Sequence, residues 1–512
     1  MSRLNEYEKS RKKHFSFLKA NNIEPFPYSF NKTHNSSDIF QKYNLSLKEN
    51  EYSLEIANVA GRLLVIRNMG KIAFMDLYDQ SGKIQIVCKE DIFEKKDWEL
   101  INNLDQGDIV GITGTIFKTK RGELSIDATQ ITFLSKCFLP LPEKYHGLQD
   151  PEVRYRQRYL DMIINPEVKN VFITRAKIIK IIREILQEKG FVEVETPILQ
   201  PLYGGAQARP FVTKSYVWKR KLYLSISPEL YLKRLLVGGF EKVYTISKNF
   251  RNEGVDRTHN PEFTMLELYE VYKDYNSAME LIEEIYETIA LKLYGTTKIN
   301  YQGIELDFKR PWKKLTMKQA LKELADIDVD KMSDVDIKKL LQEKLVKDKD
   351  IHMNQYQKTI GLETGNDISL EFNKGLAIEE LFNIFCEPKL LQPTHIIDHP
   401  KETTPLCKLH RLDKSLIERD EPYANYTELA NIYSELNDPF LQEKLMKEQK
   451  KQGRAKGETH PIDKDFILAL KYGMPPAYGI GIGIDRLVML FTNSQSIRDV
   501  ILFPMLKEKE EK

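Results

Sequence analysis

The stretch from residue 250 to residue 272, FRNEGVDRTHNPEFTMLELYEVY, constrains the fold most, because two apolar strands flank a densely charged loop. Side chains alternate between the two faces of a strand. After the loop, one face therefore mixes apolar and polar side chains, namely Phe263, Met265, Glu267, Tyr269 and Val271. An acid among apolar neighbours is costly unless a cation pairs with it. We interpret the hairpin as a platform that presents charged groups to a ligand, against the alternative of a solvated loop.

The composition bounds the class of protein. The chain has 512 residues, too many for one core, so we expect two or more domains. Its 41% hydrophobic and 30% charged residues suit a soluble globular protein, and the net charge of +2 gives no global signal for polyanion binding. Four widely spaced cysteines without a CxxC pair argue against a zinc site or a disulfide framework. Without a signal peptide or a transmembrane run, we expect a cytoplasmic protein that does not contact membranes.

Changes of pattern divide the chain into four parts. Residues 1–50 are charged, helical at first and then irregular, and residues 51–145 contain five short strands with glycine-rich turns. Five strands in so short a segment favour a small barrel, with the oligonucleotide-binding OB-fold as the leading candidate. Residues 146–165 are typical of a proline-punctuated linker or hinge with a basic face. Residues 166–512 alternate strands and helices and form one larger α+β domain.

Two acids stand out in ERDEPYANYTELANIYSELND. Glu421 and Glu428 are seven residues apart, and a pair of carboxylates beside a sheet can hold Mg²⁺ together with phosphates. Asn431, Tyr433 and Glu435 then follow with a period of two, so they share one strand face. Taken alone, the stretch favours a solvated acidic loop, so its meaning depends on the other motifs.

Two glycine-rich stretches add to the pattern. In GIGIGIDRLVML, repeated glycines let a ligand or another backbone approach closely, although a tightly packed buried strand has the same pattern. Arg486 follows where the strand turns into a helix, a place that suits a phosphate. GGAQARPF, residues 204–211, offers backbone groups to a small ligand, and alone it is typical of a turn. Together the motifs supply the charges that ATP and Mg²⁺ require, from Arg251, His259, Arg486, Glu421 and Glu428.

These motifs resemble those of class II aminoacyl-tRNA synthetases. FRNEG…HNPEFTMLELY is similar to motif 2, GIGIDRLVMLFTNSQSIRDVILFP to motif 3, and EVETPIL to the end of motif 1. With an N-terminal OB-fold, the chain is similar to the subgroup that charges lysine, aspartate and asparagine. PELYLKRLLVGGFEKVY, HNPEFTMLELY, YSELND and DHPKETTPL look specifically like the lysyl-tRNA synthetases, and the resemblance covers nearly the whole chain.

The resemblance implies an α+β fold in which helices flank an antiparallel sheet, preceded by a five-stranded OB-fold barrel. It implies a homodimer built partly by motif 1. It also implies an enzyme that forms lysyl-adenylate and pyrophosphate from L-lysine and ATP with Mg²⁺, and then transfers lysine to the 3′ end of the lysine tRNA.

The same resemblance gives each matched position an expected role. The residues expected to hold ATP are Arg251, Glu253, His259, Asn260, Phe263 and Arg486, with Arg251 and Arg486 also catalytic. Those expected to bind lysine are Gly205 and Glu267 at the α-amino group, Arg251 and Asn431 at the carboxylate, Glu229, Tyr269 and Glu435 at the ε-ammonium, and Tyr433 along the stem. The metal ligands are Glu421 and Glu428, and the anticodon is read by Arg67, Phe74, Gln85 and Glu123.

The chain departs from the family pattern at four positions. Ser225 and Ser227 stand where arginine and alanine are usual, and Asp420 replaces an aromatic residue. Tyr478 replaces a small residue just before the glycine strand, so we expect its ring to tighten the pocket around lysine or the adenylate.

Three alternatives stay open. An aspartyl- or asparaginyl-tRNA synthetase has the same scaffold, but its pocket needs a cation or amide donors, whereas Glu229 and Glu435 offer acids. A non-catalytic tRNA-binding paralogue is disfavoured because both arginines and both expected Mg²⁺ ligands are present. An enzyme that transfers lysine to a protein would have no use for an anticodon-binding barrel.

Overall fold

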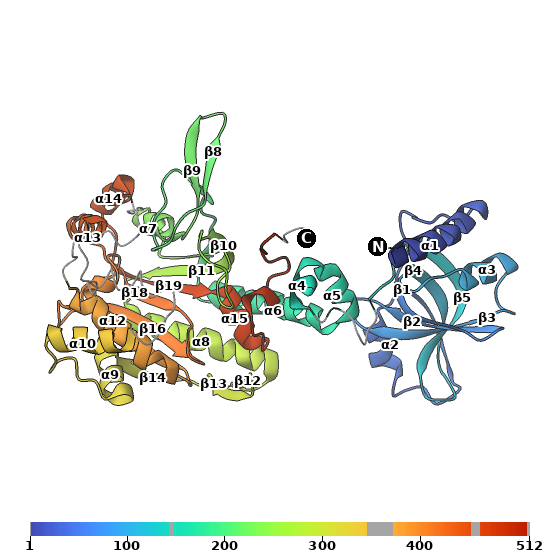
Figure 1. Ribbon diagram of the computed structural model, residues 1–512. Coiled ribbons are helices and arrows are strands. Elements are labelled where there is room, and N and C mark those ends of the chain that lie inside the picture. Colours follow the sequence, from blue (N-terminus) through green and yellow to red (C-terminus); the bar gives the residue numbers. More distant parts are fainter. Residues whose placement is uncertain (1, 143–147, 149, 346–371, 452–460, 509–512) are drawn as a thin grey trace. The chain divides into compact units, whose positions relative to one another are not determined.

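The computed structural model describes residues 2–142, 148, 150–345, 372–451 and 461–508 (Figure 1). The chain divides into two compact units, Met1–Gln149 and Asp150–Lys512. Among the described residues, no helix combines the length and the apolar character needed to cross a membrane.

The first unit is a closed five-stranded barrel with the strand order β1-β2-β3-β5-β4. Its strands are β1 (Tyr52–Asn68), β2 (Ile72–Tyr78), β3 (Lys83–Lys89), β4 (Ile109–Lys118) and β5 (Leu124–Ser135). Its helices are α1 (Ser2–Ala20), α2 (Ser36–Tyr43) and α3 (Lys95–Asn102). Alternate residues fill the barrel interior, for example Ala73, Met75 and Leu77 of β2, and Leu18 of α1 and Ile39 of α2 join the same core. The N-terminal helices therefore pack on the barrel.

The second unit is built on a nine-stranded sheet with the order β14-β15-β16-β18-β19-β11-β10-β6, in which β17 also pairs with β16. Its strands are β6 (Val192–Glu193), β10 (Lys242–Phe250), β11 (Glu262–Val271), β14 (Lys313–Thr316), β15 (Thr394–Pro400), β16 (Leu416–Ala424), β17 (Thr427–Glu428), β18 (Asn431–Ser434) and β19 (Ala477–Gly483). Every pairing is antiparallel except those of β14 with β15 and of β6 with β10. The predicted antiparallel sheet is therefore present, and among the described residues its parallel pairings lie at its two ends.

Two smaller sheets and a set of helices complete the second unit. The small sheets contain β7 (Leu199–Gln200), β8 (Val212–Ser215) and β9 (Arg220–Leu224), and β12 (Lys298–Tyr301) with β13 (Ile304–Asp307). The α-helices are α4 (Pro151–Arg156), α5 (Arg158–Ile164), α6 (Glu167–Glu188), α7 (Glu229–Val237), α8 (Tyr275–Tyr294), α9 (Met317–Ala325), α10 (Asp334–Leu345), α12 (Lys374–Phe385), α13 (Pro439–Lys451), α14 (Lys464–Lys471) and α15 (Ile484–Phe491). Short 3₁₀ helices are η1 (Glu387–Lys389), η2 (Lys401–Thr403) and η3 (Ile497–Asp499).

The main core lies on one face of the large sheet, under helices α6, α8 and α15. Leu266 and Leu268 of β11 and Ile480 and Ile482 of β19 are fully or almost fully buried there. Because side chains alternate along a strand, the intervening residues of both strands point to the opposite face. That opposite face carries the candidate site.

Two segments differ from expectation or extend beyond the described residues. The expected basic linker forms α4 and α5, and its Arg158 is only 1% exposed, with an ion pair to Asp161 at 3.0 Å. Arg154 binds the same carboxylate at 2.8 Å, so these two arginines are already paired and do not form a free basic face. The lysine- and acid-rich segment 310–370 contributes α9 and α10, and its residues from 346 onward lie outside the described part of the chain.

Candidate functional site

The open face of the sheet owes its space to the glycines of β19. Gly479 lies opposite Tyr269 of β11, and Gly481 lies opposite Glu267. A Cβ at Gly479 would come within 2.5 Å of the Tyr269 ring, and one at Gly481 within 2.7 Å of the Met265 methyl group. Larger residues there would displace the side chains of β11. The glycine repeat therefore forms the floor of a site, as a close approach to a ligand requires.

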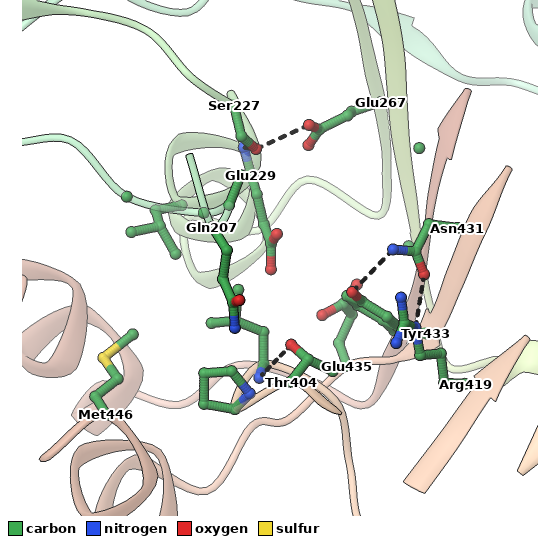
Figure 2. Close-up of a pocket in the computed structure, with 18 of the residues that line it drawn as sticks. Gln207, Ser227, Glu229, Glu267, Thr404, Arg419, Asn431, Tyr433, Glu435 and Met446 are labelled. Carbon is green, nitrogen blue, oxygen red and sulfur yellow. Dashed lines mark hydrogen bonds between the residues drawn. The ribbon is translucent and has the colours of Figure 1, made fainter. Parts of the chain in front are cut away.

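A first cavity of about 340 Å³ lies over this floor and is rich in carboxylates (Figure 2). Glu267 is buried there, and it accepts hydrogen bonds from Ser227 Oγ at 2.8 Å and Tyr269 Oη at 3.1 Å. Burial, and then the negative charge of Glu229, raise the pKa of Glu267 to about 8, although the two hydrogen bonds act to lower it. A cationic ligand would stabilise the ionised form of such a buried acid, so the position favours a cation.

Two further acids of this cavity are joined by a lysine. Lys233 is fully buried, and its Nζ lies 2.6 Å from Glu229 Oε1 and 2.5 Å from Glu435 Oε2. The Glu435 contact lacks hydrogen-bond geometry, so within the described chain this buried oxygen has no hydrogen-bond donor. Burial acts to lower the pKa of Lys233, but the charges of the two acids outweigh it and raise that pKa. The cluster holds two acids and one cation, so it keeps an excess of negative charge.

Lys233 is a site residue that the sequence interpretation missed. It follows Glu229 by four residues on α7, and residues four apart are neighbours on a helix surface. That spacing in PELYLKRL was the available signal. The pairing of Lys233 with Glu435, in contrast, depends on a segment about 200 residues away, which no local pattern reveals.

A second cavity of about 360 Å³ adjoins the first. The residues that line both are Arg251, Met265, Arg419, Asn431 and Gly481. The Arg251 guanidinium lies 5.0 Å from the centre of the Phe263 ring, and its Nε is buried without a hydrogen-bond partner among the described residues. Burial lowers the pKa of Arg251. A buried guanidinium with an unused donor at the junction of two cavities is suited to an anionic group.

Arg486 and His259 both line the second cavity and contact each other. Arg486 Nη2 lies 3.1 Å from His259 Nε2, and His259 Nδ1 lies 2.8 Å from Asp256 Oδ2. A guanidinium only donates, so Nε2 must accept and the proton resides on Nδ1. Asp485, beside Arg486, accepts from the Thr264 amide at 2.6 Å and pairs with Arg175. The start of α15 is thereby anchored, which fixes the direction of Arg486.

The two carboxylates of the predicted metal site both line the second cavity. Burial acts to raise the pKa of Glu421, but its contact with Arg419 outweighs this and the pKa lies below its ordinary value. Burial, and then the charge of Glu421, raise the pKa of Glu428 to about 7. Crowded carboxylates of this kind fit a divalent cation. No group of three or more metal-ligating side chains occurs among the described residues, so phosphate oxygens would have to complete the shell, as Mg²⁺ commonly requires.

Arg419 is the second residue that the sequence interpretation missed. Its Nε donates to Asn431 Oδ1 at 3.1 Å, while Asn431 Nδ2 donates to Tyr433 Oη at 3.1 Å (Figure 2). Arg419 also contacts Glu421 and lies 3.3 Å from Glu379. Strands β16 and β18 pair Arg419 with Tyr433, which brings these side chains together. Arg419 therefore links the expected metal ligands to the expected lysine-binding residues.

The remaining predicted residues of the second unit also line these cavities. Gly205, with φ of +86°, lies in the first cavity, and an added Cβ would come within 2.9 Å of Ser227 Oγ. Glu253 and Asn260 line the second cavity, and Asn260 Nδ2 donates to the Glu262 carbonyl at 2.6 Å. All residues predicted for ATP, lysine and Mg²⁺ thus meet in two adjoining cavities.

The four residues predicted to read an anticodon lie in the barrel of the first unit. Phe74 is half-buried, lies outside the barrel core and sits opposite Arg67. Gln85 lies on the next strand and accepts a hydrogen bond from Ser125 Oγ at 3.0 Å. Glu123 lies in the turn before β5. Strands β1, β2 and β3 are neighbours, so three of the four predicted residues come from adjacent strands.

Known proteins match the chain along nearly all of its length. A family model described as tRNA synthetases class II (D, K and N) matches residues 150–507, and one described as OB-fold nucleic acid binding domain matches residues 57–134. A lysine–tRNA ligase of Pelotomaculum thermopropionicum is 46% identical over 512 residues, which cover 99% of this chain and 96% of the relative. One of Carboxydothermus hydrogenoformans is 44% identical over 508 residues, which cover 99% of each. The chain belongs to the lysine–tRNA ligase family of class II synthetases. The predicted fold class is thereby confirmed.

The structure overturns one expectation about this ligase. Tyr478 is 1% exposed, packs in the main core and lines neither cavity. Its Oη donates to Glu270 Oε2 at 2.5 Å. Gly479 faces the site, so its neighbour must face the other side of the sheet. The expectation that the Tyr478 ring tightens the lysine pocket is wrong.

The other departures also have structural partners. Ser227 donates to Glu267 in the first cavity, whereas Ser225 is buried behind it and donates to Asn249 Oδ1 at 3.1 Å. Asp420 points away from the site and lies 2.7 Å from Nδ1 of buried His395. Burial acts to lower the pKa of His395, but Asp420 and Glu283 outweigh it and raise the pKa to about 9. Asp420 is thus part of a buried ion pair beneath the sheet.

We expect Tyr478→Phe to lower the free energy of unfolding of the full chain by about 1–2 kcal/mol, because buried Glu270 loses a hydrogen bond. Affinity for lysine and ATP, measured by calorimetry, should stay unchanged. Tyr272→Phe, at a side chain that is 69% exposed, is the control and should be neutral in both measurements. A changed lysine affinity with unchanged stability would contradict the assignment of Tyr478 to the core.

Proposed function

We propose that the protein is a lysine–tRNA ligase. It activates L-lysine with ATP to lysyl-adenylate and pyrophosphate, and it transfers lysine to the 3′ end of the lysine tRNA. One observation carries this proposal: Glu229, Glu267 and Glu435 line the first cavity, where Lys233 pairs with two of them, and Arg251 and Arg486 line the adjoining second cavity. A substrate with two ammonium groups balances the acids, and a polyphosphate balances the arginines.

The first cavity supports a definite placement of lysine. The α-amino group binds Glu267 near Gly205, and the carboxylate binds Arg251 and Asn431 at the junction with the second cavity. The ε-ammonium then meets Glu229, Glu435 and Tyr269, and the alkyl stem packs on Tyr433. Selectivity follows from burial, because a ligand without the ε-charge leaves buried carboxylates uncompensated. Aspartate and asparagine lack that charge, so the corresponding synthetases are disfavoured as alternatives.

Adenylate formation needs little from the protein beyond position and charge. A carboxylate oxygen of lysine attacks the α-phosphorus of ATP, a new O–P bond forms, and the bond to the β-phosphate oxygen breaks as pyrophosphate leaves. The nucleophile is already an anion, so no general base is required. Arg251 neutralises charge on the carboxylate and α-phosphate, and Arg486 stabilises the triphosphate. Phe263 supports the adenine ring, with Glu253, His259 and Asn260 around the nucleotide.

Glu421 and Glu428 would hold Mg²⁺ through their carboxylates. Bound there, the ion would supply positive charge that offsets the negative charge of the phosphates. The raised pKa of Glu428 and the charge of neighbouring Glu421 support this assignment, because a cation relieves their repulsion. Arg419, already bound to Glu421, keeps that carboxylate in place.

Transfer requires the 3′ hydroxyl of the tRNA to attack the adenylate carbonyl, with AMP as the leaving group. The barrel supports recognition of the tRNA at its anticodon, where bases are unpaired and open to stacking. Phe74 stacks on one base, and Arg67, Gln85 and Glu123 contact base edges.

We also propose a cytoplasmic homodimer. Four large apolar side chains of the motif 1 region are exposed in the single chain, which supports their burial against a second copy: Ile173, Val192, Ile198 and Leu199. All four cysteines are free, which suits a reducing compartment. Sedimentation velocity of the full chain tests the dimer.

The proposed activity is tested by the exchange of label between pyrophosphate and ATP. The exchange is measured in the presence of each of the 20 standard amino acids in turn, in about 20 parallel assays. Strong exchange with lysine alone is expected. The proposal would be refuted if aspartate or asparagine supported exchange in place of lysine, or if none of the amino acids supported it.

The Michaelis constant for lysine should depend on pH. Burial raises the pKa of both Glu267 and Glu435 to about 8, so both take up protons in the empty pocket below that pH. The ammonium groups bind carboxylates, so binding releases protons, and the constant should fall as pH rises from 6 to 8. The slope is about tenfold per pH unit for each proton released.

Two variants test whether these acids produce the pH dependence. Glu435→Gln should weaken lysine binding. It should also lower by one the number of protons released on binding, so the Michaelis constant should change less steeply with pH. Lys233→Met removes a cation that favours the ionised acids, so its profile should move to higher pH. A Michaelis constant for lysine that stays flat from pH 6 to 9 in the unmodified protein would contradict this assignment of the acids.

Arg486→Lys should reduce the exchange rate by about 100-fold or more, because an ammonium cannot reproduce the planar guanidinium at the triphosphate. Arg257→Lys is the matched control, since Arg257 belongs to the neighbouring loop, is exposed and lines neither cavity. Circular dichroism should show both variants folded. Equal exchange rates in the two variants would remove Arg486 from the mechanism.

Phe74→Ala should weaken tRNA charging by roughly 1–3 kcal/mol, the worth of one base stacked on an aromatic ring. Exchange without tRNA should be unaffected, because the expected ATP and lysine residues all lie in the other unit. Tyr28→Ala, at an exposed ring of the first unit, is the control. If Phe74 instead serves stability, thermal unfolding will shift while discrimination against anticodon variants persists.

A further inference from the structure

A hairpin formed by β8 and β9 carries exposed apolar rings at its tip. The two strands pair from Val212–Tyr223 to Ser215–Arg220, and the tip is the segment between them. Tyr216 is 88% exposed, Val217 86% and Trp218 67%. The hairpin projects from the body of the second unit (Figure 1). Three consecutive exposed apolar residues at a tip favour a surface that is covered by a partner.

The hairpin is also strongly basic. It contains Lys214, Lys219, Arg220 and Lys221, while no acid occurs between Glu195 and Glu229. None of the four cations forms an ion pair with any residue that the structure describes. The Arg220 guanidinium lies 5.0 Å from the centre of the Trp218 ring, and Lys221 Nζ lies 5.4 Å from that of Tyr223. For a chain with a net charge of +2, this is a concentrated local charge, interleaved with rings.

The base of the hairpin is fixed to the rim of the first cavity. Residues 204–207 before the hairpin, and Ser227, Glu229 and Leu230 after it, line that cavity. The Asn252 amide donates to the Arg209 carbonyl at 2.7 Å, and the Phe250 amide donates to the Ser225 carbonyl at 2.8 Å. At roughly 3.3 Å per strand residue, the tip reaches about 20 Å beyond this rim. A ligand held along the hairpin is therefore led towards the lysine pocket.

This chemistry matches single-stranded nucleic acid. Cations neutralise phosphates, and exposed rings stack on unpaired bases. An anionic membrane would also attract such a tip, and a second copy of the chain could cover its apolar rings. The proposed transfer step, however, already requires an RNA 3′ end at the foot of this hairpin. Position therefore favours RNA over the other two partners.

We propose that the β8–β9 hairpin docks the single-stranded acceptor end of the tRNA and leads its 3′ terminus to the adenylate. This inference rests on the proposed lysine–tRNA ligase activity. Trp218 supplies the main stacking surface, and Lys219 and Lys221 contact phosphates along the ribbon.

Two variants of the full chain test the docking surface. Trp218→Ala should raise the Michaelis constant for the lysine tRNA by about tenfold, the effect expected for one stacked base, with little change in the turnover number at saturating tRNA. Lys219→Glu with Lys221→Glu should weaken tRNA binding. It should also make the salt dependence of binding shallower, by about 0.7 in log–log slope for each phosphate that the hairpin no longer neutralises. Exchange without tRNA should match the unmodified chain.

Matched controls use exposed residues elsewhere on the second unit. Tyr472→Ala removes a ring that is 81% exposed, and Lys331→Glu with Lys339→Glu reverses two exposed charges. Both should leave tRNA binding unchanged. The inference is overturned if the hairpin variants bind and charge tRNA as the controls do. It is also overturned if they lose only binding to vesicles of anionic phospholipid, or if they change only the sedimentation coefficient.

Failure of the proposed ligase activity can be distinguished from failure of the docking inference. If the unmodified chain shows no lysine-dependent exchange, the ligase activity itself fails. If exchange and charging are normal and the hairpin variants charge normally, only the docking inference fails.

Discussion

The candidate site depends on the pairing of β11 with β19. This pairing sets Glu267 and Tyr269 against glycines on one face of the sheet, and Leu266 and Leu268 against isoleucines on the other. A slip of one residue would turn Glu267 into the core and the leucines into the cavity, which would strongly destabilise the fold. The apolar face packed on α8 and α15 therefore holds the charged face in register.

Charge balance is the second constraint on the site. The first cavity contains more carboxylates than cations even with Lys233 present, and burial, followed by the charge of Glu229, raises the pKa of Glu267 and Glu435. The second cavity contains Arg251 and Arg486 beside Glu421 and Glu428. Arg419 and Asn431 line both cavities and join them through a hydrogen bond. We propose that a cationic amino acid compensates the excess of acids in the first cavity, and that its carboxylate meets the α-phosphate at Arg251, which lines both cavities.

Much of this arrangement was predictable because it is periodic. The alternation in β11, the glycine repeat of β19 and the period of two from Asn431 to Glu435 each assign residues to a face without reference to the rest of the chain. The five-stranded barrel was predictable for the same reason. The spacing of Lys233 from Glu229 was visible, but its pairing with Glu435 was not. Arg419 was missed because the pairing of β16 with β18 is what brings it to Asn431 and Tyr433. The core position of Tyr478 was also present in the sequence, because alternation places it on the face opposite to Gly479.

By itself, the sequence determined which side chains share a strand face, where glycines leave room, and which residue types could serve ATP, lysine and Mg²⁺. It determined these because backbone geometry imposes a period of two on any strand. Only the tertiary structure decided that Lys233 lies between Glu229 and Glu435, that Arg419 connects two cavities, and that a basic aromatic hairpin starts at the cavity rim. Contacts between segments that are far apart in the sequence depend on strand order and packing, and a local pattern reveals neither of these.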